Sequence, residues 1–441
     1  MKRPLIILSF DGMDTKDIAF LKTQPGFRRF LAEASGSDQV KSIYPSVTYA
    51  AHASIITGCL PSRHGIVDNT KVQPKRFKDP DWYWYQKDIK VPTLYDLAIA
   101  KGYSVAALLW PTTGRSKIDF NMPEIFSNRK WTSQLMVSLY AGTPGFQMKM
   151  VKKHFALRKG KSQPHLDHFT TAVTLDTIHD HQPDMMLVHL TDLDSIRHHH
   201  GHDSEEAKDA LLRHDHRLSE ILDAISAYEK YNDCYMVVLG DHGSIDVSHG
   251  ISMNSWLKQI GFLTYDPVGS KAVNPFTNVD AFAKSCDGSS YLYLFDPDRA
   301  HELESQVSKL LIEHPGLFTI HTQPVITDLG ADPQAFMMLE AIAPYHFVDD
   351  FIEPFIGPID QIPYYAGRKN TAVHGFSPEL TDYKTCFYVK GPGIVPGIDL
   401  GVMSLIDIAP TLAQLLDFDL ADVDGHTKHQ LLLQEEPHET N

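Results

Sequence analysis

Hydrophobic and polar residues follow two different periods along most of this chain. Short runs with the spacing of strands, most of them apolar, occur at residues 4–10, 39–43, 103–109, 185–190 and 234–239. Stretches with helical spacing lie between them, at residues 26–34, 51–57, 93–100, 165–181 and 204–231. Because strands and helices alternate, the pattern predicts βαβ units, and therefore an α/β fold with a mostly parallel central sheet sandwiched between helices.

The alternation breaks after residue 252. Residues 290–295 and 318–322 have strand patterns on either side of a helical pattern at 299–313, and Pro and Gly recur between 329 and 367. This combination predicts a small inserted α/β cap with a loop-rich return. The parallel pattern is expected to resume at 384–389, before a closing helix at 406–418. We therefore predict a discontinuous core (residues 1–255 and 369–425), an inserted cap (256–368) and a polar tail (426–441).

A second interruption covers residues 128–163, which are basic, Met-rich and amphipathic. The plainer interpretation of this segment is a pair of surface helices. The alternative is a lid over a binding site.

The composition is that of an ordinary globular protein, with 43% hydrophobic and 22% charged residues in a chain of 441. The formal net charge of −15 argues against duplex nucleic acid as a partner. It leaves room for a small anionic substrate, because bound metal ions reverse the local field. Four widely spaced cysteines without C-x-x-C pairing are typical of free thiols in a reducing compartment.

The N-terminal residues MKRPLIILSFDG imitate a signal peptide, but Asp11 interrupts the apolar run and no small-residue cleavage site follows. We interpret the run as the first strand. No other segment approaches the roughly twenty apolar residues of a membrane helix. We therefore expect a cytoplasmic protein without a membrane partner; the sequence does not define its oligomeric state.

The stretch from 183 to 201 carries the densest group of chemically active side chains. An apolar strand pattern at 185–190 delivers Asp192, Asp194, His198, His199 and His200 at its carboxyl end. Ligands just beyond such a strand lie where open α/β sheets bind substrates. Asp194 and His198, one helical turn apart, suit a divalent metal ion. The alternative is a solvated surface cluster of histidines.

Other strands end in similar residues. Asp11 follows the first strand, Asp241 and His242 follow the strand at 234–239, and His374 lies just before the strand at 384–389. A single Asp after a strand is usually a turn residue. Several carboxylates and imidazoles on one edge of one sheet are harder to attribute to turns, and imidazole is the commonest neutral metal ligand.

These residues lie in strings that carry a resemblance. In order along the chain they are FDG at 10–12, PSVTYAAHASIITG at 45–58, PSRHGI at 61–66, DSIRHHHG at 194–201, GDHG at 240–243, HGF at 374–376 and DIAPTL at 407–412. The chain thereby resembles the alkaline phosphatase superfamily, specifically its nucleotide pyrophosphatase/phosphodiesterase-like branch. The resemblance implies the alkaline phosphatase-like sandwich and two divalent metal ions, zinc with manganese as the alternative.

The resemblance also implies a role for each matching residue. One metal would be held by Asp11, Asp241, His242 and the hydroxyl of Thr48, and the other by Asp194, His198 and His374. Thr48 matches the nucleophile and would become a phosphothreonine. A threonine hydroxyl needs activation, which metal coordination supplies, and the helix N-terminus beneath it attracts phosphate. The alternative for Thr48 is a helix N-cap.

Neighbouring polar residues receive supporting roles. Asp192 is expected to orient a ligand imidazole or to replace Asp194 as ligand. His199 and His200 are expected to face solvent. His52 and His64, although inside the family-like strings, are expected to serve packing and loop hydrogen bonds.

One position departs from the resemblance. An asparagine three residues after the nucleophile is expected to hold a phosphoryl oxygen, and the residue there is Ala51, which cannot donate. Asn69 is the candidate replacement, with Lys71 as a charged alternative. This departure leaves the substrate class open more than it threatens hydrolysis, because two metals supply much of the charge stabilisation.

Aromatic residues lie where the resemblance places the leaving-group pocket. Trp82, Trp84 and Trp110 would form a platform on which a nucleobase stacks, at roughly 1–3 kcal/mol per base. The alternative is that these rings close the edge of the core or pack against the cap.

We therefore predict a two-metal hydrolase of phosphoric esters or anhydrides, preferably a phosphodiesterase or nucleotide pyrophosphatase. Its partner would be a small phosphorylated substrate, with a nucleotide as one option. The alternatives are a phosphomonoesterase, a phosphonoacetate-type hydrolase, and a non-catalytic relative that binds metal or a phosphoryl ligand. A sulfatase is disfavoured because no C/S-x-P-x-R string surrounds position 48, and a cofactor-independent phosphoglycerate mutase would have serine there.

Overall fold

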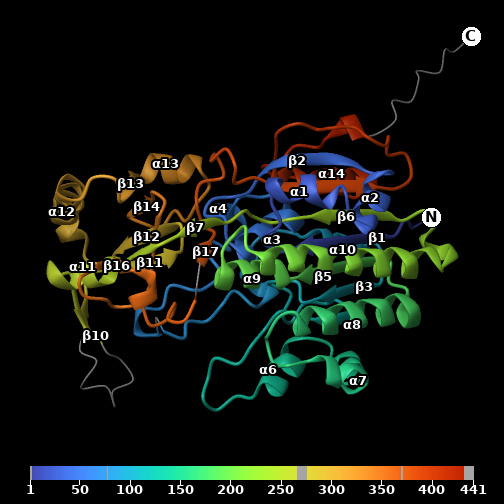
Figure 1. Cartoon of the computed structure of the whole chain (residues 1–441), viewed down its shortest axis with the longest axis horizontal. Coiled ribbons are helices and arrows are strands. Elements are labelled where there is room, and N and C mark those ends of the chain that lie inside the picture. The colour runs from blue at the N-terminus through green and yellow to red at the C-terminus, as the bar shows by residue number, and fades with distance from the viewer. Residues whose placement is uncertain (1, 77, 266–275, 369–370, 432–441) are drawn as a thin grey trace, which may run out of the picture.

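The computed structural model of the chain describes residues 2–76, 78–265, 276–368 and 371–431, and its largest feature is a central sheet (Figure 1). Within these residues, eight strands form this sheet in the order β19-β2-β18-β6-β1-β5-β3-β4. Their bounds are β1 (Leu5–Phe10), β2 (Ser35–Lys41), β3 (Val105–Leu108), β4 (Phe120–Met122), β5 (Met185–Leu190), β6 (Tyr235–Leu239), β18 (Thr385–Lys390) and β19 (Met403–Ser404).

The middle of the sheet is parallel. β1 lies between β5 and β6, so that Ile7 pairs with Leu187 on one side and with Val237 on the other. All three strands are buried along their whole length, which explains why their sequences are continuously apolar. The predicted mostly parallel α/β sandwich is confirmed.

The strand β18 corrects one prediction. It was expected to resume the parallel pattern, but it runs antiparallel to both β6 and β2. Thr385, its first residue, donates a hydrogen bond to the carbonyl of Met13 at the carboxyl edge of the sheet. The chain returns from the insertion at that edge, so the strand has to run in the opposite direction. Apolar periodicity does not encode strand direction.

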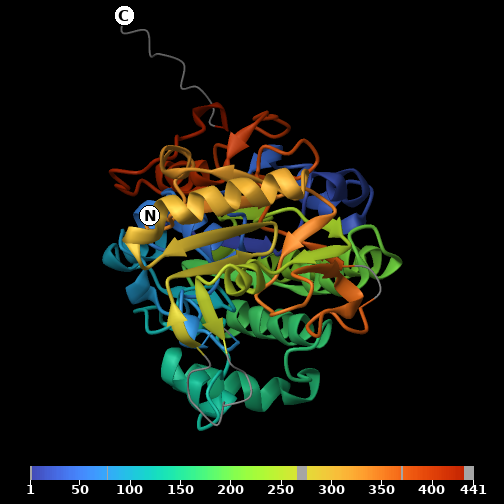
Figure 2. The same ribbon diagram turned by 90° about the vertical axis from the view of Figure 1, so that its left-hand side faces the viewer.

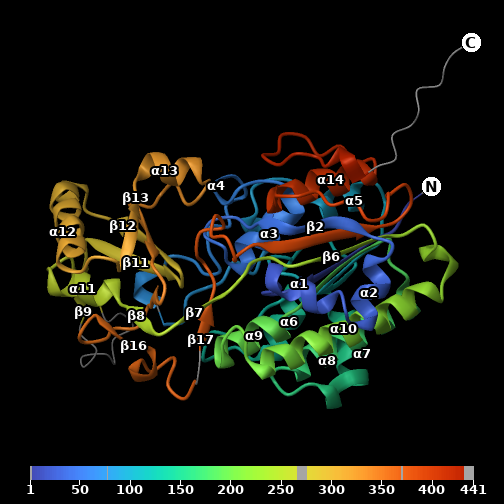
Figure 3. The ribbon, with the colours of Figure 1, turned by 45° about the horizontal axis from the view of Figure 1, so that its top comes forward.

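Helices cover both faces of the sheet, as Figure 3 shows. One face is covered by α3 (Thr48–Thr57), α5 (Leu94–Ala100) and α14 (Ile408–Leu415). The other is covered by α1 (Thr15–Leu21), α2 (Pro25–Leu31), α8 (His165–His181), α9 (Asp192–His200) and α10 (Glu205–Ser226).

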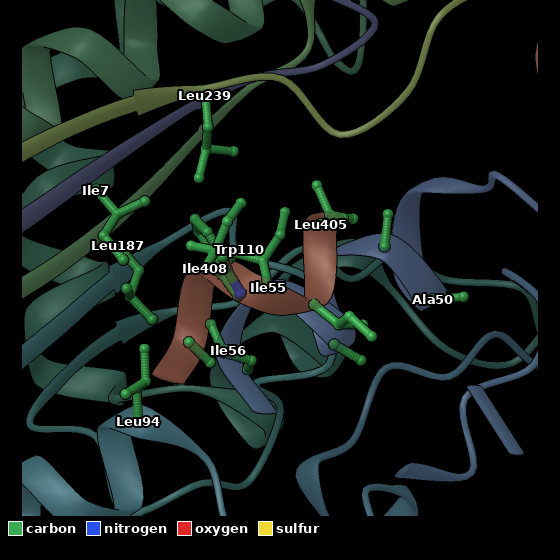
Figure 4. Close-up of a cluster of buried hydrophobic side chains, with 14 of the residues drawn as sticks. Ile7, Ala50, Ile55, Ile56, Leu94, Trp110, Leu187, Leu239, Leu405 and Ile408 are labelled. Carbon is green, nitrogen blue, oxygen red and sulfur yellow. The ribbon is translucent and has the colours of Figure 1, made fainter. Parts of the chain in front are cut away.

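The core under α3 positions the site. Ile7, Leu187 and Leu239 project from the sheet toward Ile55 of α3 and Ile408 of α14, and all five are fully buried (Figure 4). Burying such side chains contributes about 1.5–3 kcal/mol each. The first turn of α3 is therefore fixed beside the carboxyl edge of the sheet.

The insertion forms a second, smaller sheet at the end of the molecule seen on the left in Figure 1 and facing the viewer in Figure 2. Among the described residues, this antiparallel sheet has the order β11-β12-β14-β13. The bounds of its strands and neighbours are α11 (Met253–Gln259), β9 (Leu263–Tyr265), β10 (Phe276–Val279), β11 (Ala281–Cys286), β12 (Ser289–Leu294), α12 (Ala300–Glu313), β13 (Phe318–His321), α13 (Gln323–Asp328) and β14 (Met337–Ala341). The boundaries of core, cap and tail stay predictions, and residues 432–441 of the tail lie outside the described residues.

Short ribbons join the insertion to the core. They are β7 (Ile245–Val247), β8 (His249–Ile251), β15 (Tyr345–Phe347), β16 (Ile356–Pro358) and β17 (Thr371–Val373). β17 pairs antiparallel with β7, with Val373 opposite Ile245. β7 follows the GDHG string and β17 precedes His374, so the ribbon ties the start of the insertion to its end.

Residues 128–163 contain α6 (Gln134–Ala141) and α7 (Pro144–His154), which lie beyond α8 at the lower edge of Figure 1. The plainer interpretation of this segment, a pair of surface helices, therefore agrees with the structure. The remaining helix, α4 (Pro61–His64), is a single turn after α3. None of the helices in the described part of the chain is both long enough and apolar enough to cross a membrane.

Candidate active site

The carboxyl edge of the central sheet brings together residues that are far apart in the sequence. Asp11 follows β1, Asp194 lies in the first turn of α9 after β5, Asp241 and His242 follow β6, and His374 follows β17. These residues form two groups of candidate ligand atoms, and within each group all the atoms lie within 4.8 Å of one another. The first group belongs to Asp11, Asp241 and His242, and the second to Asp194, His242 and His374. Each group combines carboxylate and imidazole, which suits a divalent cation.

The first group is tightly packed around His242. Its Nε2 atom lies 3.2 Å from Asp241 Oδ2 and 3.4 Å from Asp11 Oδ1. Its ring lies beside that of His374, with 4.1 Å between centroids and 30° between the ring planes. The backbone N–H of Gly12 donates to the other oxygen of Asp241 at 3.0 Å. One oxygen of Asp241 is thus held by the protein and the other is aimed into the group.

Three buried atoms in these groups lack a hydrogen-bond partner in the structure: Asp11 Oδ1, Asp241 Oδ2 and His374 Nδ1. Buried polar atoms are normally paired, because an unpaired one costs free energy. Burial, reinforced by the charges of Asp241 and Asp194, raises the pKa of Asp11 well above its ordinary value. Bound cations would satisfy all three atoms and relieve the repulsion, so the two groups fit two divalent metal ions.

His198 lies beside the second group. Its Nε2 is 3.4 Å from Asp194 Oδ1, and its ring is 5.2 Å from that of His374. Arg197 holds this helix in place, because its buried guanidinium donates to the carbonyl of Gly12 at 2.5 Å and to Asp17 at 2.6 Å. The structure therefore brings His198 to the site, while its role as a ligand stays a prediction.

Gly12 explains the glycine of the FDG string. Its φ is +71°, and a Cβ atom there would lie 3.2 Å from the Cβ of Asp194. Glycine tolerates this conformation and permits the close approach. The loop after β1 and the first turn of α9 can therefore bring Asp11 and Asp194 to one site.

Thr48 is the first residue of α3, and the N-cap residue is Val47, which has no side-chain capping bond. The alternative interpretation of Thr48 as a helix N-cap is therefore wrong. Its hydroxyl lies 3.3 Å from His242 Nε2 and borders the cavity in front of the sheet. The helix then ends at Thr57, where the predicted helical stretch also ends, and Gly58 is its C-cap.

Asn69 is held beside Thr48 by the backbone. Its Oδ1 accepts the N–H of Tyr49 at 2.8 Å, which fixes the orientation of the amide. The side chain lines the cavity, and its NH₂ group donates no hydrogen bond within the part of the chain that the structure describes. Asn69 can therefore donate to a phosphoryl oxygen.

The charged alternative considered for that donor, Lys71, is wrong. The ammonium group of Lys71 is bound to both carboxylate oxygens of Asp88 at 2.8 Å, and Lys71 does not line the cavity. Ala51 is buried in the core with the rest of α3. Because Lys71 forms an ion pair with Asp88, its ammonium group is not available to a substrate. The sequence alone did not reveal that Asp88 lies so close.

Replacing Asn69 with alanine should lower kcat for bis-p-nitrophenyl phosphate by about 100-fold, as removal of one donor to a developing oxyanion does elsewhere. Steady-state kinetics with metal analysis of the same samples would measure it. Asn69→Asp is the matched control, since it keeps an acceptor for the N–H of Tyr49 but loses the donor, and it should be at least equally slow. Near-normal kcat in Asn69→Ala would contradict the assignment.

The cavity in front of the two groups has a volume of about 350 Å³. Tyr49, Trp82 and Phe126 form an aromatic wall, with ring centroids of Trp82 at 5.2 Å from Tyr49 and 4.9 Å from Phe126. Tyr364 and Tyr365 reach the cavity from the insertion. Trp82 therefore lies where the sequence placed a substrate-binding ring.

Trp84 and Trp110 do not lie in the cavity where substrate-binding rings were predicted. Trp84 is 5% exposed and packs against Phe126, and Trp110 is fully buried with its ring edge-on to His52 at 4.8 Å. Neither residue lines the cavity. The prediction that they bind substrate is wrong, and the alternative that the rings close the core is correct for both. Large rings are the side chains that gain most from burial.

His189 is a supporting residue that the sequence analysis missed. It projects from β5, and its Nε2 lies 3.1 Å from Asp11 Oδ2 while its Nδ1 lies 3.6 Å from Glu124. Burial alone would lower the pKa of His189, but the hydrogen bonds with Asp11 and Glu124 outweigh it and hold the pKa well above its ordinary value. A single polar residue inside an otherwise apolar strand was the available signal.

Arg158 and Lys161 are also on the cavity wall and were not predicted individually. They come from the basic segment at 128–163, and Lys161 Nζ lies 3.8 Å from the ring centroid of Phe126. Burial lowers the pKa of both side chains. They add positive charge to a cavity otherwise lined by several carboxylates.

The predicted role of Asp192 is wrong. Its buried carboxylate accepts hydrogen bonds from Arg213 at 2.7 Å and from Arg217 at 2.8 Å, both on α10, instead of orienting a ligand imidazole. The helix α9 turns its two aspartates to different sides, because residues two apart lie on different faces. His199 is exposed as predicted, and His200 is half-buried, 3.3 Å from Glu206.

His52 and His64 serve packing and hydrogen bonding, as predicted. His52 Nδ1 donates to the carbonyl of Thr48 at 2.8 Å, beneath the first turn of α3. His64 Nδ1 accepts the N–H of Ile66 at 3.1 Å, and its Nε2–H donates to Ser54 Oγ at 2.9 Å. Both imidazoles are fully buried. The hydrogen bonds of His64 therefore select its neutral form.

The protein should lose stability on acidification, partly through His64. Burial lowers the pKa of His64 to about 3, against 6.5 when unfolded. Between these values only the unfolded chain binds the proton, so the unfolding free energy falls with decreasing pH by about 1.4 kcal/mol per unit. His64→Gln should remove that slope in denaturant titrations between about pH 6 and pH 4. The exposed His301→Gln should not; an unchanged slope in His64→Gln would contradict the prediction.

The fold and the site together define a class: α/β proteins with two groups of candidate metal ligands at the carboxyl edge of a mostly parallel sheet. The sequence model of the family described as "Type I phosphodiesterase / nucleotide pyrophosphatase" matches residues 5–316. The chain belongs to this family.

Individual relatives are distant. The chain is 22% identical to venom phosphodiesterase 2 of Crotalus adamanteus over 258 residues, which cover 56% of this chain and 27% of the venom protein. It is 21% identical to human ectonucleotide pyrophosphatase/phosphodiesterase family member 1 over 441 residues, covering 96% of this chain and 41% of the human protein. The chain thus spans about a quarter to two fifths of these relatives.

Solved structures share the fold. Murine ectonucleotide pyrophosphatase/phosphodiesterase 5 superposes with a TM-score of 0.68 at 16% identity, covering 98% of this chain and all (100%) of that one. An inactive variant of the same murine protein in complex with AMP matches with the same TM-score at 15% identity.

Proposed function

We propose that this chain is a metal-dependent hydrolase of phosphoric esters or anhydrides, with phosphodiesterase or nucleotide pyrophosphatase activity. The observation that carries the proposal is the hydroxyl of Thr48, held 3.3 Å from His242 at the start of α3 and facing a cavity flanked by both ligand groups. Membership of the family supports the same reaction class.

The ligand groups suggest how the metal would be used. Asp11, Asp241 and His242 with Thr48 would hold one ion, and Asp194, His198 and His374 the other. Two such ions, zinc with manganese as the alternative, would neutralise phosphoryl oxygens and acidify the Thr48 hydroxyl.

The protein's own groups then account for the displacement. Thr48 Oγ1 attacks phosphorus, the bond to the leaving alcohol or phosphate breaks, and the hydroxyl proton passes to solvent or the leaving group. Asn69 donates to a phosphoryl oxygen as charge develops on it. Water then cleaves the phosphorus–oxygen bond of phosphothreonine, releases the phosphoryl product and restores the hydroxyl.

The cavity favours a small substrate with an aromatic leaving or retained group. A nucleobase can stack against the wall of Tyr49, Trp82 and Phe126, at roughly 1–3 kcal/mol per base. Arg158 and Lys161 offer charge to a further phosphate. The AMP bound to the murine relative supports a nucleotide as the substrate class.

The deciding experiment compares bis-p-nitrophenyl phosphate with p-nitrophenyl phosphate after metal removal and after addition of zinc or manganese. Chelated protein should be inactive, and restored protein should prefer the diester. A preference for the monoester would favour a phosphomonoesterase. Absence of turnover with either metal, while two metal ions bind tightly, would show a non-catalytic relative and contradict the proposal.

We also propose a cytoplasmic location. The four cysteines are free thiols and all are buried, which is compatible with a reducing compartment. Fractionation of cells that express the tagged full-length protein would test this location.

A further inference from the structure

The segment from 128 to 163 has a charge opposite to that of the chain. It contains no Asp or Glu, and its basic residues are Arg129, Lys130, Lys149, Lys152, Lys153, Arg158, Lys159 and Lys161. The whole chain has a formal net charge of −15. Some of these residues form ion pairs with the rest of the chain: Arg129 pairs with Asp81, and Lys153 pairs with Asp176. Lys130, Lys152 and Lys159 are exposed and form no ion pair within the described residues.

The same segment exposes large apolar side chains. Of the fifteen exposed large hydrophobic residues in the described part of the chain, seven lie in it: Trp131, Leu135, Met136, Tyr140, Met148, Phe155 and Leu157. Trp131 is 79% exposed and Phe155 is 72% exposed. Single exposed apolar residues need no explanation, but such a concentration marks an interaction surface.

An apolar pocket opens beside three of these exposed residues. It has a volume of about 450 Å³ and lies between α6, α7 and the start of α8. Leu135, Met148 and Phe155, three of the exposed residues, are part of its lining, together with the more deeply placed Val151 and Phe169. Figures 1 and 2 both show α6 and α7 at the edge of the molecule, away from the central sheet.

We propose that residues 128–163, the segment that contains α6 and α7, form a docking surface for an anionic lipid bilayer. Exposed Trp, Phe, Leu and Met among unpaired lysines is the composition of helices that lie in the headgroup region of membranes. Lysines near an anionic leaflet are attracted to it, while the remaining surface of the chain, which is acidic, is repelled. The surface thus also sets the orientation of the bound protein.

Charge argues against a second copy of the chain as the occupant. A two-fold dimer through this surface would place two basic segments without any acidic residue against each other. The expectation of no membrane partner rested on the lack of a spanning segment, which does not bear on docking at the interface. The proposal can be tested apart from the proposed hydrolysis, because none of the residues substituted in its test is a metal-ligand candidate or lines the catalytic cavity.

Docking would bring the catalytic cavity close to the bilayer. The apolar pocket and the catalytic cavity share five lining residues, namely Leu109, Ile125, Gln134, Arg158 and Leu166. The surface and the site are therefore neighbours in the fold.

The test is sedimentation of the full chain with vesicles of phosphatidylcholine alone or with about one third phosphatidylserine. We expect binding to be at least about tenfold stronger with phosphatidylserine, and to weaken at high salt. The double variants Lys152→Glu/Lys159→Glu and Trp131→Ser/Phe155→Ser should each lower the partition coefficient by about tenfold or more. Hydrolysis of bis-p-nitrophenyl phosphate in solution should be unchanged in both.

Matched controls lie on α12, at the far end of the molecule. Ile312→Ser removes a side chain that is 81% exposed, and Lys309→Glu reverses an exposed charge; neither should alter binding. Equal binding to both vesicle types would overturn the proposal. Full binding by the Trp131→Ser/Phe155→Ser variant would also overturn the proposal, because the attraction between charges would then account for all of the binding. Concentration-dependent dimers that this variant abolishes, without vesicle binding, would show a second copy as the occupant.

Discussion

Replacing Thr48 with alanine should lower kcat/KM for bis-p-nitrophenyl phosphate by about 10⁴-fold or more. The hydroxyl, 3.3 Å from His242, supplies the attacking oxygen and is not needed to build the fold. The carboxylates and imidazoles of both ligand groups remain, so metal analysis of the variant should still give nearly two ions per chain. Steady-state kinetics and metal content measured on the same sample check both halves of the expectation.

Two variants control for damage to α3. Thr48→Ser keeps a hydroxyl and should retain part of the activity. Thr57→Ala makes the same change at a buried threonine of the same helix, whose hydroxyl donates to the carbonyl of Ala53 and accepts the N–H of Cys59, away from the ligand groups. It should lower stability slightly and leave kcat/KM near normal. Activity retained by Thr48→Ala would remove Thr48 from the role of nucleophile.

Replacing His374 with alanine should cost the protein one of its two metal ions. His374 Nδ1 is buried without a hydrogen-bond partner, beside Asp194 and His242. Burial, reinforced by the neighbouring His242 and His198, lowers the pKa of His374 well below its ordinary value, so the ring is neutral and able to ligate. Losing an ion that would neutralise the reacting phosphoryl group should lower kcat/KM by about 10³-fold or more.

Metal content per chain is the primary measurement for this variant, and anomalous scattering from crystals would show which position is empty. His199→Ala is the matched control, because His199 is exposed and, among the residues that the structure describes, its side chain hydrogen-bonds only to the backbone carbonyl of Ser195. It should keep both ions and full activity. A His374→Ala protein that still carries two ions would exclude His374 from the ligand set.

Local patterns predicted the central architecture well. The apolar runs before Asp11, Asp194 and Asp241 are the three adjacent parallel strands β1, β5 and β6. Carboxyl ends of parallel strands share one edge, so the side chains that follow them had to meet. The role of His374 as a ligand rested on the resemblance alone, because β17, which positions it, is a three-residue strand without a pattern of its own.

The errors share a physical cause. The roles of Asp192 and Lys71 depended on partners elsewhere in the chain, Arg213 and Asp88, which local spacing does not reveal. Trp84 was predicted beside Trp82 in the pocket, but the chain bends at Tyr83 between them, and the ring of Trp84 joined the core. The direction of β18 depended on where the insertion returns. Long-range contacts decided all of these.

The β7–β17 ribbon has a consequence for how such a protein can diverge. Val373 pairs with Ile245, so the chain enters the insertion and returns from it through the same two-stranded ribbon, close in sequence to His242 and His374. The entropy of closing a loop grows only with the logarithm of its length, and doubling the length costs about 0.6 kcal/mol. A lineage can therefore lengthen, shorten or exchange the inserted module without relocating the histidines. Substrate preference is free to evolve while the chemistry is inherited unchanged.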